Sequence, residues 1–120
     1  MDDYAILGGL TAVHQFCRIG KHAITGGCSK IVQDVPPFMV ADGNPAEIRS
    51  INSVGLQRRG FGEEQIKALK EAYKVVFLRN LTISEAINQL KASASDSNED
   101  IPLQELIAFI DTSKRGIIRR

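Results

Sequence analysis

Apolar side chains near the start of the chain recur every six residues. In steps of six from residue 7, the first position holds Leu7, Val13, Ile19, Thr25 and Ile31. The second position is glycine in three of these five hexads, and the fifth is always small or β-branched. Neither an α-helix nor an alternating strand has this period. The pattern predicts hexapeptide-repeat coils of a parallel β-helix over residues 1–36, with position one inside and position two at a corner.

The alternative is a glycine-rich hairpin region that fits a period of six by chance. The column of small residues at position five favours the β-helix, because a repeat signature strengthens with every hexad that stays in phase. Three hexads close one coil, so this segment supplies fewer than two coils. Repeat units bury their core only against neighbours. We therefore expect the coil to continue in a part of the protein outside this chain, or to be covered by other subunits.

The pattern changes at Pro36 and Pro37, which lack backbone donors and so end the repeat. Residues 37–62 have scattered glycines and no sustained period, and we expect an extended connecting loop there. An apolar stripe with acidic residues at its start then predicts a helix from Glu63 to about Arg79.

Two further helices are expected after that stripe. Thr82 and Glu85 fit a capping box that opens one helix. Pro102 suits the first turn of another, which Gly116 is expected to end. The predicted fold is therefore mixed β and α: the end of a parallel β-helix, a connecting loop, and a three-helix unit over residues 63–120.

Composition narrows the possible functions. The 120 residues include 15 Lys and Arg against 14 Asp and Glu, a net charge of +1, which argues against nucleic acid as the main partner. Apolar runs are too short for a membrane span, and the acidic start is no signal peptide, so we expect a cytoplasmic protein. Cys17 and Cys28 lack metal-ligand or redox spacing; we expect no metal and no cofactor, and both thiols small and buried.

The two histidines differ in how strongly their positions suggest a functional role. His14 stands at position two, where three other hexads have glycine, so it is either a ligand or catalytic group projecting from the coil or a surface histidine at a tolerant corner. The residues alone leave these two interpretations open. His22 has no such peculiarity, and we expect a solvated surface side chain.

Two groups of basic residues have no acidic neighbour in the sequence. Arg58 and Arg59 lie between glycines; paired guanidiniums can hold a phosphate, although a solvated loop or a salt bridge between subunits is the more ordinary interpretation. The last residues of the chain form a basic tail suited to an acidic partner. The tail comprises Lys114, Arg115, Arg119 and Arg120.

Several motifs together resemble a known family, the bacterial acyl-carrier-protein:UDP-N-acetylglucosamine O-acyltransferases of lipid A synthesis. The resemblance covers nearly the whole chain and corresponds to the C-terminal half of these enzymes. The motifs are ILGG at residues 6–9, AVHQFC at 12–17, GGCS at 26–29, QDVPP at 33–37 and GLQRRGF at 55–61.

The resemblance implies a left-handed β-helix and a homotrimer with active sites between subunits. It implies transfer of a hydroxyacyl chain from acyl carrier protein to the 3-hydroxyl of UDP-N-acetylglucosamine. By motif, His14 and Gln15 would line the site, and His14 would support catalysis. Asn52 and Arg58 would contact the nucleotide, with Arg59 adding positive charge. The basic tail would suit the acidic carrier protein.

By the same resemblance, Gly27 matches the position that limits acyl-chain length. The family's catalytic base is a histidine upstream of this segment. We therefore expect the chain alone to be a catalytically incomplete part of the enzyme. Two other interpretations are a non-catalytic trimeric module that binds carrier protein and nucleotide, and the related N-acyltransferase of the same pathway, which the HQ and RR pairs fit less well.

Overall fold

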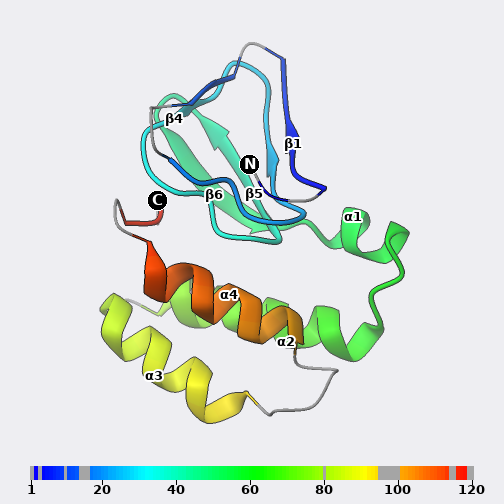
Figure 1. Cartoon of the computed structure of the whole chain (residues 1–120), viewed down its shortest axis with the longest axis vertical. Helices are drawn as coiled ribbons and strands as arrows, with labels where there is room; N and C mark the ends of the chain where they lie inside the picture. The colour runs from blue at the N-terminus through cyan, green and yellow to red at the C-terminus, as the bar shows by residue number, and fades with distance from the viewer. Residues whose placement is uncertain are drawn as a thin grey trace.

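A computed structural model of the chain describes residues 2, 4–9, 11–13, 17–79, 81–94, 101–113 and 116–118. Short strands are stacked in one part of the molecule and helices lie beside one another in the other part (Figure 1). The strands are β1 (Ile6–Leu7), β2 (Ala12–Val13), β3 (Ile24–Thr25), β4 (Lys30–Ile31), β5 (Met39–Gly43) and β6 (Ala46–Ile51). The helices are α1 (Ser53–Arg58), α2 (Glu63–Tyr73), the π-helical η1 (Lys74–Leu78), α3 (Ile83–Ser93) and α4 (Ile101–Thr112).

The first strands form stacked, parallel coils. β1 pairs with β3 through Ile6 and Ile24, and β2 pairs with β4 through Ala12 and Lys30. Each pair is eighteen residues apart, which is three hexads per coil. A third face is marked by the parallel bridge between Ile19 and Val35. The six-residue period thus corresponds to parallel stacking, as predicted.

The last coil is covered by two segments that lie outside the repeat. β5 continues the parallel stack beside β3, and β6 turns back antiparallel to it. On the third face the C-terminal segment adds a layer, because Ile117 bridges Asp34. The Asp34 N–H donates to the Gly116 carbonyl at 3.0 Å, and Ile118 donates to the Asp34 carbonyl at 2.9 Å. Segments far apart in the sequence therefore close this end of the coils.

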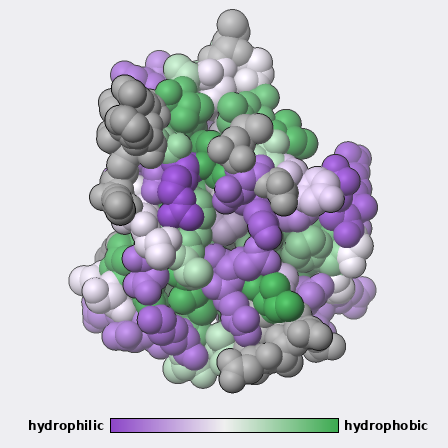
Figure 2. Space-filling model, in the orientation of Figure 1, coloured by the Kyte–Doolittle hydropathy of each residue, from purple (hydrophilic) through white to green (hydrophobic). Residues whose placement is uncertain are grey.

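The interior of the coils is complete at one end and open at the other. At position one, Ile19, Thr25 and Ile31 are at most 3% exposed, as expected for the interior. Leu7 and Val13, at the same position one coil earlier, are 39% and 37% exposed. Figure 2 shows apolar surface gathered over the strand-containing part of the molecule. The first coil therefore has no layer of the described structure packed on its outer side.

The expected corner at position two is wrong. Positive φ angles occur at position four instead, in Tyr4, His22 and Cys28. Glycine at position two is explained by the close approach of the next coil, because a Cβ on Gly8 would lie 2.6 Å from the Gly27 nitrogen. Because Cys28 lies at a position-four turn, its side chain is exposed rather than buried.

The extended loop expected over residues 37–62 is also wrong as local structure. Residues 39–51 form the β5–β6 hairpin, in which Ala46, Ile48 and Ile51 are buried and the residues between them are exposed. This alternation is the strand signal that the glycines and proline around the turn obscured. The short helix α1 follows and adds a fourth α-helix upstream of the predicted three.

The three expected helices are present. α2 begins after Gly62 with two acidic residues in its first turn and runs into the π-helical turn η1. Thr82 and Glu85 make the predicted capping box before α3, with reciprocal hydrogen bonds of 3.0 and 3.2 Å. α4 ends at Thr112 rather than at Gly116. Within the described part of the chain, none of the helices has the length and hydrophobicity needed to cross a bilayer.

Candidate functional site

Helix α1 places two arginines beside the coils. Asn52 caps its N-terminus, because the side-chain oxygen accepts the Gly55 N–H at 3.2 Å. Leu56 is fully buried and anchors the helix. Gly60, with φ of +85°, follows the last turn and directs the chain away from the helix. The sequence around Arg58 and Arg59 therefore folds as a capped helical turn, not as a flexible loop.

A cavity of about 320 Å³ separates α1 from the coils. One wall comes from successive coils and is mainly aromatic and aliphatic; the other comes from α1 and its cap and is mainly polar and basic. The lining residues are Tyr4, Ile6, His22, Ile24, Asn52, Val54, Gly55, Arg58 and Arg59. The structure thus brings together three of the predicted site residues, Asn52, Arg58 and Arg59. We call this cavity the α1 cleft.

The two arginines of the α1 cleft are exposed. Within the described residues, no ion pair includes Arg58 or Arg59. The Arg59 guanidinium carbon lies 4.3 Å from the centre of the Tyr4 ring. A salt bridge from this pair to another subunit stays a prediction, since these ion pairs all lie within one chain. Two cations without carboxylates at one wall of a cleft can bind a multiply charged anion.

Asn52 joins the two walls of the cleft. It is only 8% exposed, and its side-chain nitrogen donates to the His22 carbonyl at 2.8 Å. With the Gly55 N–H bound at its oxygen, one amide N–H and one oxygen lone pair remain for a ligand. Asn52 therefore fixes α1 against the coil and keeps limited hydrogen-bonding capacity toward the cleft.

The structure places His22 differently from the expected surface histidine. Its residue is 8% exposed, and its ring stacks on Tyr4 at 5.0 Å between centroids. Phe38 lies on the same column at 5.9 Å, and Phe61 meets the ring edge-on at 5.1 Å. Tyr4 and His22 were not predicted as cleft residues. Their spacing of eighteen residues, one coil, is the signal that places both at one corner.

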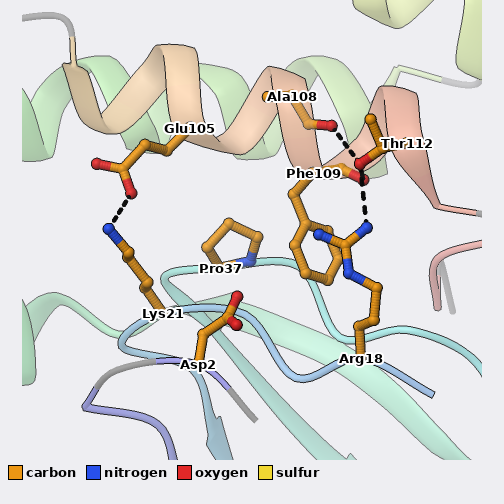
Figure 3. Close-up of a pocket in the computed structure, with 8 residues that line it drawn as sticks. All are labelled: Asp2, Arg18, Lys21, Pro37, Glu105, Ala108, Phe109 and Thr112. Atoms are coloured by element: carbon orange, nitrogen blue, oxygen red, sulfur yellow. Dashed lines mark hydrogen bonds and ion pairs between the residues drawn. The ribbon is translucent and has the colours of Figure 1, made fainter. Parts of the chain in front are cut away.

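A second cleft lies between the coils and α4, as shown in Figure 3. Its volume is about 230 Å³. Its cations already have partners: Lys21 pairs with Glu105 at 2.8 Å, and Arg18 donates to Thr112 at 3.0 Å. The Arg18 guanidinium also lies 4.1 Å from the centre of the Phe109 ring. These contacts hold α4 to the coil, so the α1 cleft is the better candidate for binding an anion.

Other predicted site residues lie elsewhere or outside the described structure. Gly27 is exposed on a turn of the coils and does not line the α1 cleft; a Cβ there would meet the Gly9 oxygen at 3.3 Å. His14 and Gln15 lie outside the described residues, as do the four basic residues of the tail. In the described ranges, no group of three or more His, Cys, Asp or Glu side chains is placed to hold a metal ion.

Comparison with known proteins identifies the family. The sequence profile of the family described as "Udp N-acetylglucosamine O-acyltransferase; Domain 2" matches residues 34–118. The chain belongs to this O-acyltransferase family. An acyl-[acyl-carrier-protein]–UDP-N-acetylglucosamine O-acyltransferase of Burkholderia orbicola is 50% identical over 118 residues, which are 98% of this chain and 45% of the relative. Its namesake in Herminiimonas arsenicoxydans is 50% identical over 120 residues, with 99% and 46% covered.

Solved structures of the O-acyltransferase family agree with this assignment. The UDP-N-acetylglucosamine acyltransferase of Francisella novicida superimposes with a TM-score of 0.92 at 41% identity, covering 99% of this chain and 43% of that one. A structure from Acinetobacter baumannii gives 0.87 at 42% identity, covering 98% and 45%. The chain thus spans less than half the length of the family members it matches.

Proposed function

We propose that this chain is the C-terminal part of an enzyme that transfers a 3-hydroxyacyl group from acyl carrier protein to the 3-hydroxyl of UDP-N-acetylglucosamine, the first step of lipid A synthesis. The observation that carries the proposal is the α1 cleft, where Arg58 and Arg59 face the coils and form no ion pair with any described carboxylate. The family assignment supplies the reaction. In this proposal the coils belong to a left-handed β-helix.

The α1 cleft suits the nucleotide part of the substrate. Arg58 and Arg59 would bind the diphosphate, since guanidinium donors match phosphate oxygens in pairs. Asn52 would use its remaining N–H or oxygen toward the nucleoside. A cavity of about 320 Å³ is at the lower end of the range for ligand sites. The acyl chain would therefore lie outside the cleft, along the coils.

Gly27 is proposed to set the length of that acyl chain. Gly27 is exposed, and among the described residues an added Cβ would meet the Gly9 backbone, at 3.3 Å for the oxygen and 4.0 Å for the nitrogen. A longer side chain there would project along the outer surface of the coils and shorten the space for an acyl tail. Glycine leaves this space open.

The chain alone is proposed to lack turnover. General-base catalysis needs a side chain that takes the proton of the sugar hydroxyl. In this proposal that base is a histidine on an earlier coil, and His14 and Gln15 support it. The exposed interior positions Leu7 and Val13 support the stacking of a further coil on β1 and β2, because such positions are buried one coil later.

Two partners complete the proposed enzyme. Acyl carrier protein is acidic and would bind the basic tail through opposite charge. A homotrimer would bring the α1 cleft of one subunit beside the coils of the next. Val54 and Ile6, which are 58% and 57% exposed at the cleft, support burial against a neighbouring subunit.

A chimera tests the proposal. The upstream part of the Herminiimonas arsenicoxydans relative would be joined to this chain at the matched boundary, and turnover of 3-hydroxyacyl carrier protein with UDP-N-acetylglucosamine would be measured. We expect turnover from the chimera, none from the chain alone, and a raised KM for UDP-N-acetylglucosamine in chimeric Arg58→Ala. An inactive, folded chimera that still binds carrier protein and nucleotide would favour a non-catalytic binding module.

A further inference from the structure

Three rings form a column at one corner of the coils. Tyr4, His22 and Phe38 have φ angles of 59°, 55° and 69°. Residues other than glycine rarely adopt this backbone conformation. The Tyr4 and His22 rings are 18° from parallel, as are those of His22 and Phe38. Successive coils thus repeat the same turn, and ring stacking offsets part of the cost of that backbone conformation. The outermost ring of the column is Tyr4, whose residue is 57% exposed.

Arg59 lies on this outermost ring. Its guanidinium carbon is 4.3 Å from the Tyr4 centroid, within the range of a cation–π contact. A guanidinium that uses its flat face for a ring keeps its N–H donors, which lie in the plane, for other groups. Arg58, its neighbour on α1, has no ring contact or ion pair in the described residues. The two arginines therefore differ in how far their side chains are fixed.

We propose that Tyr4 is the positioning residue of Arg59. The column of Tyr4, His22 and Phe38 fixes one flat surface at the mouth of the α1 cleft, and Arg59 rests on it with its N–H edge available to a phosphate. The inference rests on the proposed function for the class of ligand, a nucleoside diphosphate sugar. Tyr4 acts through Arg59 and makes no bond to the ligand itself.

A double-mutant cycle tests this coupling. UDP-N-acetylglucosamine binding would be measured by titration calorimetry for the wild-type chain, Tyr4→Leu, Tyr4→Phe, Arg59→Ala and the double variant Tyr4→Leu/Arg59→Ala. We expect Tyr4→Leu to raise Kd about threefold, as for loss of an exposed cation–π contact. Tyr4→Phe keeps the ring and should bind as the wild type does. In the Arg59→Ala background, Tyr4→Leu should change nothing further.

Nuclear magnetic resonance gives a readout that needs no ligand. The side-chain protons of Arg59 should show an upfield ring-current shift, lost in Tyr4→Leu and kept in Tyr4→Phe. Leu78→Ala, at a residue that is 55% exposed on η1 and absent from the cleft lining, is the control and should keep the shift. The amide spectrum of each variant reports whether it is folded.

The outcomes separate this inference from the proposed function. A wild-type chain without the Arg59 ring-current shift overturns the positioning role. So does an equal loss of affinity from Tyr4→Leu in the presence and absence of the Arg59 side chain. A normal ring-current shift with no binding of UDP-N-acetylglucosamine contradicts the proposed ligand, while it supports the pairing of Tyr4 with Arg59.

Discussion

Replacing Asp34 by alanine should weaken the attachment of the C-terminal segment to the coils. Asp34 is 1% exposed, and among the described residues its two carboxylate oxygens accept from the Arg18 N–H at 2.8 Å and from the Ser113 hydroxyl at 2.5 Å. Its backbone carries the bridge to Ile117. One buried side chain therefore joins two coils to the segment after α4.

The magnitude follows from these two bonds. A hydrogen bond to a charged group contributes about 1.5–3 kcal/mol, so the two together contribute roughly 3–6 kcal/mol. Removing a buried carboxylate also relieves its desolvation cost, which offsets part of this sum. We expect Asp34→Ala to lower the free energy of unfolding by about 3 kcal/mol, and Ser113→Ala by about 1.5 kcal/mol.

Urea unfolding followed by circular dichroism, at pH 7 and a fixed protein concentration, measures both changes. The double variant Asp34→Ala/Ser113→Ala should be no less stable than Asp34→Ala alone, because the hydroxyl has already lost its acceptor. An Asp34→Ala variant within about 0.5 kcal/mol of the wild type would refute the reasoning, since that is the range of an unremarkable surface substitution.

Three further predictions concern other parts of the chain. Hydrogen bonds from Thr82 hold the pKa of Glu85 below its ordinary value of 4.5; the backbone bond has the larger effect and the side-chain bond the smaller. Titration by nuclear magnetic resonance should show this lowered pKa, and Thr82→Val should raise it. The carboxylate's contribution to stability is present above pH 4.5 and fades as pH falls through the lowered pKa. Gly8→Ala, whose Cβ meets backbone at 2.6 Å, should lower the melting temperature, whereas the Cβ of Gly9→Ala meets no described atom within 4 Å and should not. In the active chimera, Gly27→Met should shift preference toward shorter acyl chains, and an unchanged product profile would contradict its proposed role.

The repeat was predictable because its signal is local and redundant. Four of the five hexads have an aliphatic residue at position one, so several positions indicate the same coil. The Thr82 capping box is likewise complete within four residues. The position of the corner was not predictable from glycine alone. Gly8 is required by the close approach of the next coil, which involves residues near Gly27 that only the fold brings together.

The candidate site was predicted in part. Arg58 and Arg59 were recognisable as a basic pair, and Asn52 came from the family resemblance. The opposite wall of the cleft, which comes from the coils, was not predicted. Tyr4 and His22 meet there through stacking between successive coils, and no sequence motif marks them. The hairpin over residues 39–51 was missed because its alternation is short and is interrupted by the turn at Asn44.

The proposed ligand of the α1 cleft is a nucleotide sugar. Titration of the isotope-labelled chain with UDP-N-acetylglucosamine, followed through backbone amide shifts, tests it most directly. We expect saturable shifts centred on Tyr4, Gly55, Arg58 and Arg59, which weaken in Arg58→Ala. Shifts centred instead on the second cleft, between the coils and α4 around Arg18, would contradict binding in the α1 cleft. So would saturable binding that Arg58→Ala leaves unchanged.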